Sequence, residues 1–253
     1  MTRALPLRTA VVLAGGLGTR LRSAVPDLPK PMAPVAGRPF LAHLMDRWIA
    51  QGIERFVLSV GYRHEAIRGF FGMSYRGADV SYAVEETPLG TGGGLLLAAR
   101  TLEHAEPFLL LNGDTHFEVE LAALAAFAAC RDADWCMALF RTREPGRYMG
   151  VELGEAGRIA RLDAGTEAPE RLANGGVYVV HPRALQAALA APVASPLVAL
   201  SLENDLFPRF IGEGQRFFGL ACGGAFIDIG VPADYHRAAG VMNAVPKPAG
   251  SPA

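Results

Sequence analysis

Four short stretches hold residue types suited to phosphate and metal chemistry, and the first of them is a glycine loop. Gly15, Gly16 and Gly18 precede Thr19 and Arg20, directly after an apolar run. Successive backbone N–H groups in such a loop can converge on one point and bind phosphate. The loop has neither the third glycine of a dinucleotide fingerprint nor the Gly-Lys-Ser/Thr of a Walker loop. We therefore expect a third kind of phosphate loop with Arg20 as its cation; the alternative is an ordinary strand-to-helix turn.

The second stretch is a lysine between two prolines. Lys30 follows Arg20 by ten residues, and the prolines on both sides restrict the backbone around it. Only two of the 24 basic residues are lysines, and the other, Lys247, lies in a tail at 245–253 that we predict to be disordered. A codon bias toward arginine explains the scarcity but not why this position kept an ammonium group. We expect Lys30 to act on phosphate; a surface lysine in a loop is the alternative.

Two aspartates form the third and fourth stretches, and each ends a predicted strand. Asp114 closes the tripeptide Asn112-Gly113-Asp114, and Asp228 lies within a second apolar stretch. Open α/β sheets bind ligands at the carboxyl ends of their strands. Mg²⁺ in nucleotide sites usually takes one or two carboxylates together with phosphate oxygens and water. We predict that Asp114 and Asp228 share one Mg²⁺; a turn-stabilising role for each is the alternative.

The elements that must position these residues alternate between strand and helix up to residue 140. Strands are predicted at 8–14, 56–60, 80–85, 108–111 and 135–140, and helices at 39–51, 65–71, 92–102 and 121–130. This alternation predicts an α/β fold with a Rossmann-like, doubly wound, mostly parallel sheet and helices on both faces.

The pattern changes after residue 140. We predict a hairpin from 151–153 and 158–162, strands at 176–180, 217–221 and 225–228, and helices at 185–190, 202–211 and 232–243. The prediction is one domain over 1–244, with a nucleotide-binding half at about 9–140 and a smaller, lid-like half at 141–244.

Composition and charge argue against several classes of protein. The chain has 253 residues, of which 51% are hydrophobic and 19% charged, so it is not a disordered chain. A net charge of −1 argues against nucleic acid or an anionic membrane as a partner. No apolar run approaches the ~20 residues that span a membrane. Three scattered cysteines without a CxxC pair predict reduced, buried thiols and a cytoplasmic protein, and a homo-oligomer is left open.

Taken together, the motifs resemble those of the sugar-1-phosphate nucleotidyltransferases, from about residue 9 to residue 243. The glycine loop, Lys30, Asp114 and Asp228 carry this resemblance. Within the family, the stretch EETPLGTGG that begins at Glu85 is similar to the base-reading loop of the guanylyltransferases. The stretches ANGGVY at 173–178 and LEND at 202–205 resemble its sugar-binding segments.

The resemblance implies a role for each matching residue. The implied catalytic residues are Arg20, Lys30 and Asp114, and the implied Mg²⁺ ligands are Asp114 and Asp228. The implied nucleotide-binding residues are Leu13, Ala14, Gly15, Gly16, Gly18, Thr19, Arg20, Glu85, Pro88, Gly90, Thr91, Asn112 and Gly113. The implied sugar-phosphate-binding residues are Asn174, Gly175, Glu203 and Asn204.

Three details of this assignment are open. The base reader is Glu85, or Glu86 if the register is shifted by one residue. Gly175 is expected to leave room for the sugar ring. Many relatives carry a Glu-Lys pair before the Asn-Gly-Gly segment that is missing here, and Arg161 and Arg171 are the two candidates to replace that lysine.

The implied reaction is transfer of GMP from GTP to a sugar 1-phosphate, with release of pyrophosphate. The motif details are most similar to the branch that acts on heptose 1-phosphates. A sugar phosphate is already an anionic nucleophile near neutral pH, so no serine or histidine nucleophile is needed. The alternatives are a mannose 1-phosphate acceptor, UTP or dTTP as the nucleotide, and a non-catalytic regulatory subunit that binds sugar nucleotides. A metal-dependent glycosyltransferase is disfavoured because Asn112-Gly113-Asp114 is not an Asp-x-Asp motif.

Overall fold

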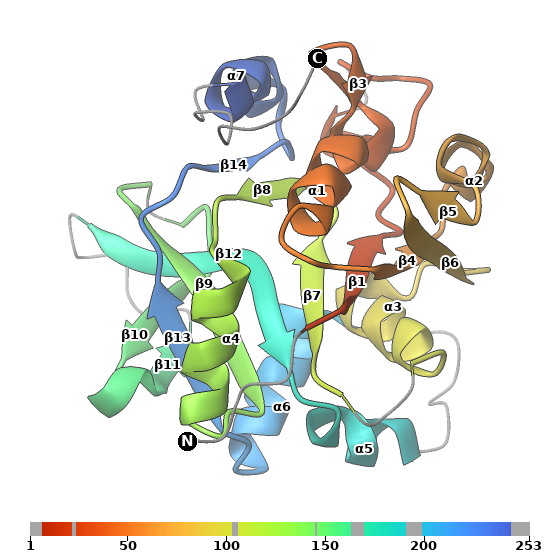
Figure 1. Ribbon diagram of the computed structural model, residues 1–253. Coiled ribbons are helices and arrows are strands. Elements are labelled where there is room, and N and C mark those ends of the chain that lie inside the picture. The colour runs from red at the N-terminus through yellow and green to blue at the C-terminus, as the bar shows by residue number, and fades with distance from the viewer. Residues whose placement is uncertain are drawn as a thin grey trace.

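The computed structural model describes residues 7–21, 24–102, 106–144, 146–162, 170–190 and 199–243. Within them, ten strands form one mixed sheet through the middle of the molecule (Figure 1). The order is β11-β10-β12-β7-β1-β4-β6-β5, and β9 pairs with both β12 and β13. The strands are β1 (Thr9–Ala14), β4 (Arg55–Val60), β5 (Ser74–Tyr75), β6 (Ala78–Val84), β7 (Phe108–Asn112), β9 (Trp135–Thr142), β10 (Gly150–Leu153), β11 (Ile159–Leu162), β12 (Arg171–Val180) and β13 (Phe217–Ala221).

Four parallel strands from the first half of the chain form the core of this sheet. Strands β7, β1, β4 and β6 run parallel, and Leu13 lies between Asn112 and Ser59 in the register. Strand β12 is antiparallel to β7, and β5 is antiparallel to β6 at the edge. The predicted Rossmann-like, mostly parallel α/β sheet is confirmed, and strands from both halves of the chain take part in it.

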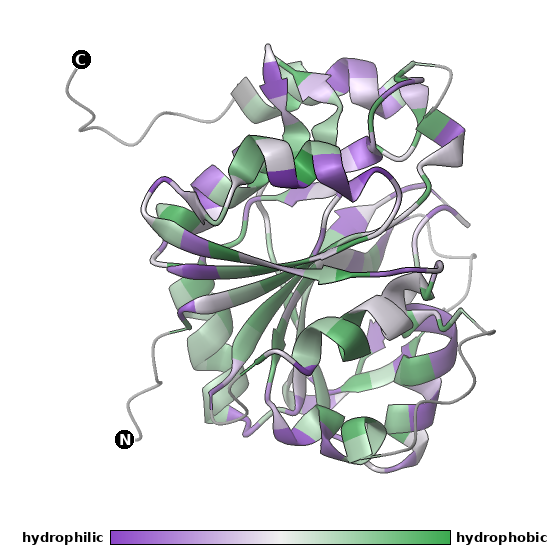
Figure 2. Cartoon of the chain, turned by 90° about the vertical axis from the view of Figure 1, so that its right-hand side faces the viewer, coloured by the Kyte–Doolittle hydropathy of each residue, from purple (hydrophilic) through white to green (hydrophobic). Residues whose placement is uncertain are grey.

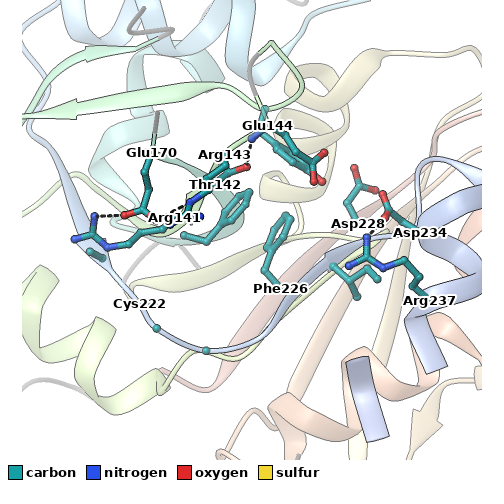
Figure 3. Close-up of a pocket in the computed structure, with 16 residues that line it drawn as sticks. Arg141, Thr142, Arg143, Glu144, Glu170, Cys222, Phe226, Asp228, Asp234 and Arg237 are labelled. Atoms are coloured by element: carbon teal, nitrogen blue, oxygen red, sulfur yellow. Dashed lines mark hydrogen bonds and ion pairs between the residues drawn. The ribbon is translucent and has the colours of Figure 1, made fainter. Parts of the chain in front are cut away.

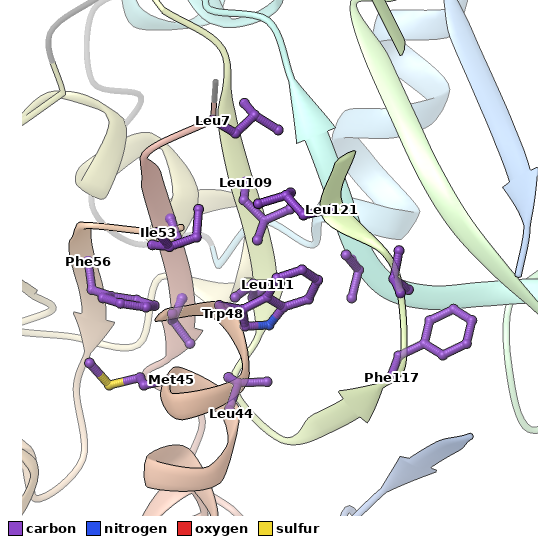
Figure 4. Close-up of a cluster of buried hydrophobic side chains, with 14 of the residues drawn as sticks. Leu7, Leu44, Met45, Trp48, Ile53, Phe56, Leu109, Leu111, Phe117 and Leu121 are labelled. Atoms are coloured by element: carbon purple, nitrogen blue, oxygen red, sulfur yellow. The ribbon is translucent and has the colours of Figure 1, made fainter. Parts of the chain in front are cut away.

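Helices cover both faces because side chains alternate along the strands. Val12 and Leu111 face one apolar cluster, whereas Val11 and Leu110 face the other. The first cluster packs against α1 and α4, with Trp48 near its centre (Figure 4), and Figure 2 shows the apolar strands between the helical layers. The helices are α1 (Phe40–Ile49), α2 (His64–Phe71), α3 (Gly90–Ala99), α4 (Leu121–Cys130), α5 (Arg183–Ala190), α6 (Phe207–Gly212) and α7 (Pro232–Asn243).

A two-stranded ribbon packs beside the sheet. It consists of β8 (Thr115–Phe117) and β14 (Phe226–Asp228), which run antiparallel. The Phe226 ring stacks on Phe140 of β9 with 3.6 Å between the ring centroids, and it meets Phe117 edge-on at 5.6 Å. These aromatic contacts hold the ribbon against the sheet. Asp228 is the last residue of β14, and Asp114 directly precedes β8.

Most predicted strands and helices are present with small shifts at their ends, but two predictions were wrong. Strand β12 starts at Arg171 instead of residue 176, because Asn174 still pairs with Leu139 of β9 and a register shift accommodates Gly176 at φ +67°. The predicted helix 202–211 is divided into a π-helix, Leu202–Leu206, and α6. Four short strands were not predicted: β5, β8, β2 (Pro34–Val35) and β3 (Arg38–Pro39).

The cysteines differ in accessibility, which corrects the expectation that all three are buried. Cys136 on β9 is buried, Cys222 is half-buried and Cys130 at the end of α4 is exposed. Burial raises the pKa of the Cys136 thiol to about 12, so its reactive thiolate is scarce near neutral pH.

We therefore expect iodoacetamide to label Cys130 first in the native protein at pH 8, and to leave Cys136 unlabelled until the protein unfolds. Peptide mass spectrometry after timed labelling measures this order. The variant Cys130→Ala should lose the fast phase. Rapid native labelling of Cys136 would contradict the buried position of β9.

None of the helices in the described part of the chain has the length and apolar character needed to cross a membrane. The predicted tail at 245–253 lies outside the described residues.

Candidate active site

A cavity of about 410 Å³ opens at the carboxyl ends of β1 and β7, where the sequence predicted a ligand site. It brings together all the predicted nucleotide-binding residues except Arg20, and adds Lys30 and Asp114. Arg20 is exposed on the short 3-10 turn Thr19–Leu21 and does not line this cavity. Sequence reasoning missed three residues of the lining, Leu17, Pro31 and Ala199.

Close backbone packing explains one glycine beside the cavity. The Gly113 N–H donates to the Leu13 carbonyl at 2.9 Å, and a Cβ on Gly113 would lie 2.6 Å from that oxygen. The turn after β7 therefore packs directly on the end of β1, which brings Asp114 beside the glycine loop. A larger residue at Gly113 would push the two strand ends apart.

The side chain of Glu85 enters the cavity just after β6. Its Oε2 accepts a hydrogen bond from the Leu89 backbone N–H at 3.0 Å, and its Oε1 accepts one from the Ser59 hydroxyl at 3.1 Å. Glu86 is exposed and is not part of the lining. Of the two predicted base readers, Glu85 is therefore the one whose carboxylate faces the cavity.

Asp114 and Asp228 come together because β8 and β14 pair. Asp228 lies opposite Thr115 in the ribbon, and the Ile229 N–H donates to the Asp114 carbonyl at 3.0 Å. The ammonium group of Lys30 hydrogen-bonds Asp114 and lies 3.6 Å from Asp228 Oδ1. The lysine side chain is only 12% exposed, so this cation is enclosed between the two carboxylates.

The electrostatics of Asp228 show that negative charge is crowded here. Burial raises the pKa of Asp228, the neighbouring Asp114 carboxylate raises it further, and Lys30 opposes both effects. Within the described residues, no three His, Cys, Asp or Glu side chains form a complete metal site. Two carboxylates with excess negative charge fit an Mg²⁺ ion that takes its other ligands from phosphate and water.

A second cavity, of about 730 Å³, has Asp228 in its lining (Figure 3), whereas Asp114 lines the first. Phe226 stands in the middle of the view, with Arg141 and Arg143 beside Glu170 on one side. Asp228, Asp234 and Arg237 lie on the other side, where the buried Asp234 accepts hydrogen bonds from Arg147 and Arg237. The sequence did not predict this cavity, because the pairs of Arg141 and Arg143 with Glu170 join residues that lie well apart in the chain.

The predicted sugar-binding residues lie outside the linings of both cavities. Glu203 is nonetheless close to the first one, because its Oε2 accepts a hydrogen bond from the Thr91 hydroxyl at 3.1 Å. The Asn174 amide donates to the Tyr178 hydroxyl at 2.6 Å. A Cβ on Gly175 would lie 2.5 Å from the Phe117 ring, so close packing of Phe117 already requires a glycine here. The expected role of Gly175 beside the sugar ring stays a prediction. Asn204 lies in the π-helix and is exposed.

Neither candidate replacement for the missing lysine lines either of these two cavities. Arg161 is exposed on β11 and pairs with Glu152 at 3.5 Å. Arg171 donates to the Tyr148 carbonyl at 3.0 Å, which holds the start of β12. The arginines that do line the second cavity are Arg141, Arg143 and Arg237.

Fold and site together define a class of phosphate-handling α/β enzyme, and comparison with known proteins identifies the family. Residues 9–243 match the family model described as Nucleotidyl transferase, and the chain belongs to this family of enzymes. It is 37% identical over 229 residues to the D-glycero-alpha-D-manno-heptose 1-phosphate guanylyltransferase of Aneurinibacillus thermoaerophilus, covering 90% of this chain and 96% of that protein.

Two further proteins are similar to this chain over most of its length. The mannose-1-phosphate guanylyltransferase of Mycobacterium tuberculosis is 34% identical, over 95% of this chain and 66% of that longer protein. The crystal structure of HddC from Yersinia pseudotuberculosis complexed with GMP-PN superposes with a TM-score of 0.78 at 29% identity, covering 92% of this chain and 99% of that chain.

Proposed function

We propose that the protein transfers GMP from GTP to a heptose 1-phosphate, giving GDP-heptose and pyrophosphate. The observation that carries this proposal is the single cavity that joins the glycine loop, a fixed carboxylate and the Lys30–Asp114 pair. The similarity to a heptose 1-phosphate guanylyltransferase over nearly the full length of both chains supports the choice of acceptor. A mannose 1-phosphate acceptor is the second candidate, supported by the mycobacterial relative.

The nucleotide half supplies recognition. The backbone N–H groups of Gly15, Gly16 and Gly18 would hold the triphosphate, with Arg20 approaching it from the exposed turn. Guanine presents N1–H and N2–H₂ side by side, and an ionised carboxylate accepts from both. Glu85 is the side chain proposed to accept these two donors, because it alone of the two adjacent glutamates lines the cavity.

The transfer itself needs alignment and charge neutralisation. A phosphate oxygen of the sugar phosphate attacks the α-phosphorus of GTP, the bond from that phosphorus to the bridging oxygen breaks, and pyrophosphate leaves with the electron pair. Lys30 offers a compact positive charge between the two carboxylates. When bound by Asp114 and Asp228, Mg²⁺ would supply the positive charge that lets two polyanions approach each other.

The second half is proposed to hold the acceptor, within one catalytic domain over 1–244. Strands of both halves share the same sheet, which supports that organisation. Glu203 is proposed to accept hydrogen bonds from sugar hydroxyls, assisted by Asn174, the backbone at Gly175 and Asn204.

Base selection tests the guanine part of the proposal. Replacing Glu85 with glutamine should lower kcat/KM for GTP by about 100-fold. The glutamine NH₂ group is a donor, so it would face one of the two guanine N–H groups without forming a hydrogen bond. Activity with UTP should change little, so the preference for GTP shrinks. Glu86→Gln is the matched control and should leave the preference intact. A wild-type enzyme that prefers UTP or dTTP would overturn the guanine assignment.

Substitution of Glu203 by glutamine tests the acceptor side. We expect KM for the sugar phosphate to rise by about tenfold, in line with loss of hydrogen bonds to a charged group, while KM for GTP stays nearly unchanged. Initial rates with each substrate varied in turn measure both constants. Equal damage to both would show that Glu203 serves to hold Thr91 and the base-reading loop in place.

A further inference from the structure

The carboxylate of Glu85 is fixed by two donors that come from different elements. The Ser59 hydroxyl, near the end of β4, donates to Oε1, and the Leu89 backbone N–H, at the start of α3, donates to Oε2. One donor on each oxygen defines the plane of the carboxylate. Since a carboxylate offers about four lone-pair positions, acceptor capacity remains for a ligand in the cavity.

Ser59 is an unusual residue for its position. It is completely buried, and the other members of the buried run Phe56–Val60 are apolar. A buried hydroxyl costs free energy unless it is hydrogen-bonded, so an apolar side chain would serve the strand better. Packing therefore does not explain the serine, whereas its hydrogen bond to the Glu85 carboxylate in the cavity does.

The surrounding glycines show that this arrangement is built into the fold. A Cβ on Gly15 would lie 2.3 Å from Glu85 Oε1. A Cβ on Gly94 would lie 2.8 Å from the same oxygen and 2.7 Å from Ser59 Oγ. The glycine loop on one side and α3 on the other therefore leave space for the serine–glutamate pair, and they restrict where the carboxylate can move.

We propose that Ser59 is a positioning residue for nucleotide specificity. Its hydroxyl orients the Glu85 carboxylate so that both oxygens meet a base edge with two adjacent N–H donors, as in guanine. A carboxylate that is already oriented does not have to reorganise when the base binds. Without the hydroxyl, Glu85 can rotate and offer a single oxygen, which a base with one N–H donor satisfies equally well. This inference rests on the proposed use of GTP.

The test compares GTP with inosine triphosphate, which keeps the N1–H of guanine but lacks its 2-amino group. In Ser59→Ala, the ratio of kcat/KM for GTP to that for inosine triphosphate should fall about tenfold, the size expected for one hydrogen bond to a charged group. KM for the sugar phosphate should stay unchanged. Ser59→Cys, which nearly keeps the side-chain volume but donates weakly, should resemble Ser59→Ala.

Ser81→Ala is the matched control, because the Ser81 hydroxyl on the neighbouring strand β6 hydrogen-bonds the Phe56 carbonyl at 3.3 Å. It should keep the wild-type ratio. A wild-type ratio in Ser59→Cys, or an equal fall in Ser81→Ala, would overturn the role of Ser59 while leaving the guanine assignment intact. A wild-type enzyme that does not distinguish GTP from other nucleotides would overturn both.

Discussion

Replacing either Asp114 or Asp228 with asparagine is expected to lower kcat by about 10²- to 10⁴-fold at saturating Mg²⁺. Each substitution removes one of the two negative charges that surround the Lys30 ammonium group, with little change in shape. The loss should be in turnover, because these charges matter most where two phosphate groups meet. Steady-state rates of pyrophosphate release at rising Mg²⁺ concentrations measure the effect.

Folding should survive both substitutions. Asp228 Oδ1 accepts the Gly230 N–H at 2.6 Å, and an asparagine oxygen can accept the same hydrogen bond. Asp46→Asn is the matched control, since Asp46 on α1 pairs with Arg38 away from either cavity. That control should keep normal turnover. Normal turnover in Asp114→Asn or Asp228→Asn would remove the residue concerned from the metal site.

The lysine should be irreplaceable even by arginine. We expect Lys30→Ala to lower kcat/KM for GTP by about 10²- to 10³-fold, in the range seen when one charge-stabilising group is lost. Lys30→Arg should lower it by about tenfold, because a guanidinium is larger and planar. The space around the lysine side chain is too small for a guanidinium. A Cβ on Gly230 would lie 3.0 Å from Lys30 Nζ, and a Cβ on Gly18 would lie 3.1 Å from Lys30 Cβ.

The variant Lys30→Arg distinguishes a functional need for lysine at this position from a lysine that remained by chance in an arginine-rich chain. In a chain with 24 basic residues of which two are lysines, an ordinary surface lysine would tolerate arginine without effect. Arg55→Lys, at an exposed position of β4, controls for the reverse exchange. Full activity in Lys30→Arg would show that no compact cation is required between the aspartates.

The sequence predicts which residues belong to the site better than it predicts the strand pairings and hydrogen bonds that bring them together. Asp114 and Asp228 were predicted from their places at strand ends, and in the structure both carboxylates lie beside the Lys30 ammonium group. The pairing that brings them together could not be predicted, because three-residue strands such as β8 show no periodicity. Ser59 escaped notice for a related reason: one serine in an apolar run says nothing about what its hydroxyl contacts on another strand.

Long-range packing sets other features of the site that the sequence does not reveal. Gly175 packs against Phe117, which belongs to a strand far earlier in the chain. Asp234 in the lining of the second cavity pairs with Arg147, which lies 87 residues away in the chain. The parallel strands were predicted well because a strand that is buried on both faces is a nearly continuous run of apolar residues.

The proposed reaction joins GMP to a heptose 1-phosphate. The most direct measurement is pyrophosphate release in a matrix of four nucleoside triphosphates against heptose, mannose, glucose and N-acetylmuramic acid 1-phosphates, with mass spectrometry of the sugar nucleotide formed. We expect the fastest release with GTP and heptose 1-phosphate, and GDP-heptose as the product. Faster turnover of mannose 1-phosphate with GTP would contradict the acceptor, and faster turnover with UTP or dTTP would contradict the guanylyltransferase assignment itself.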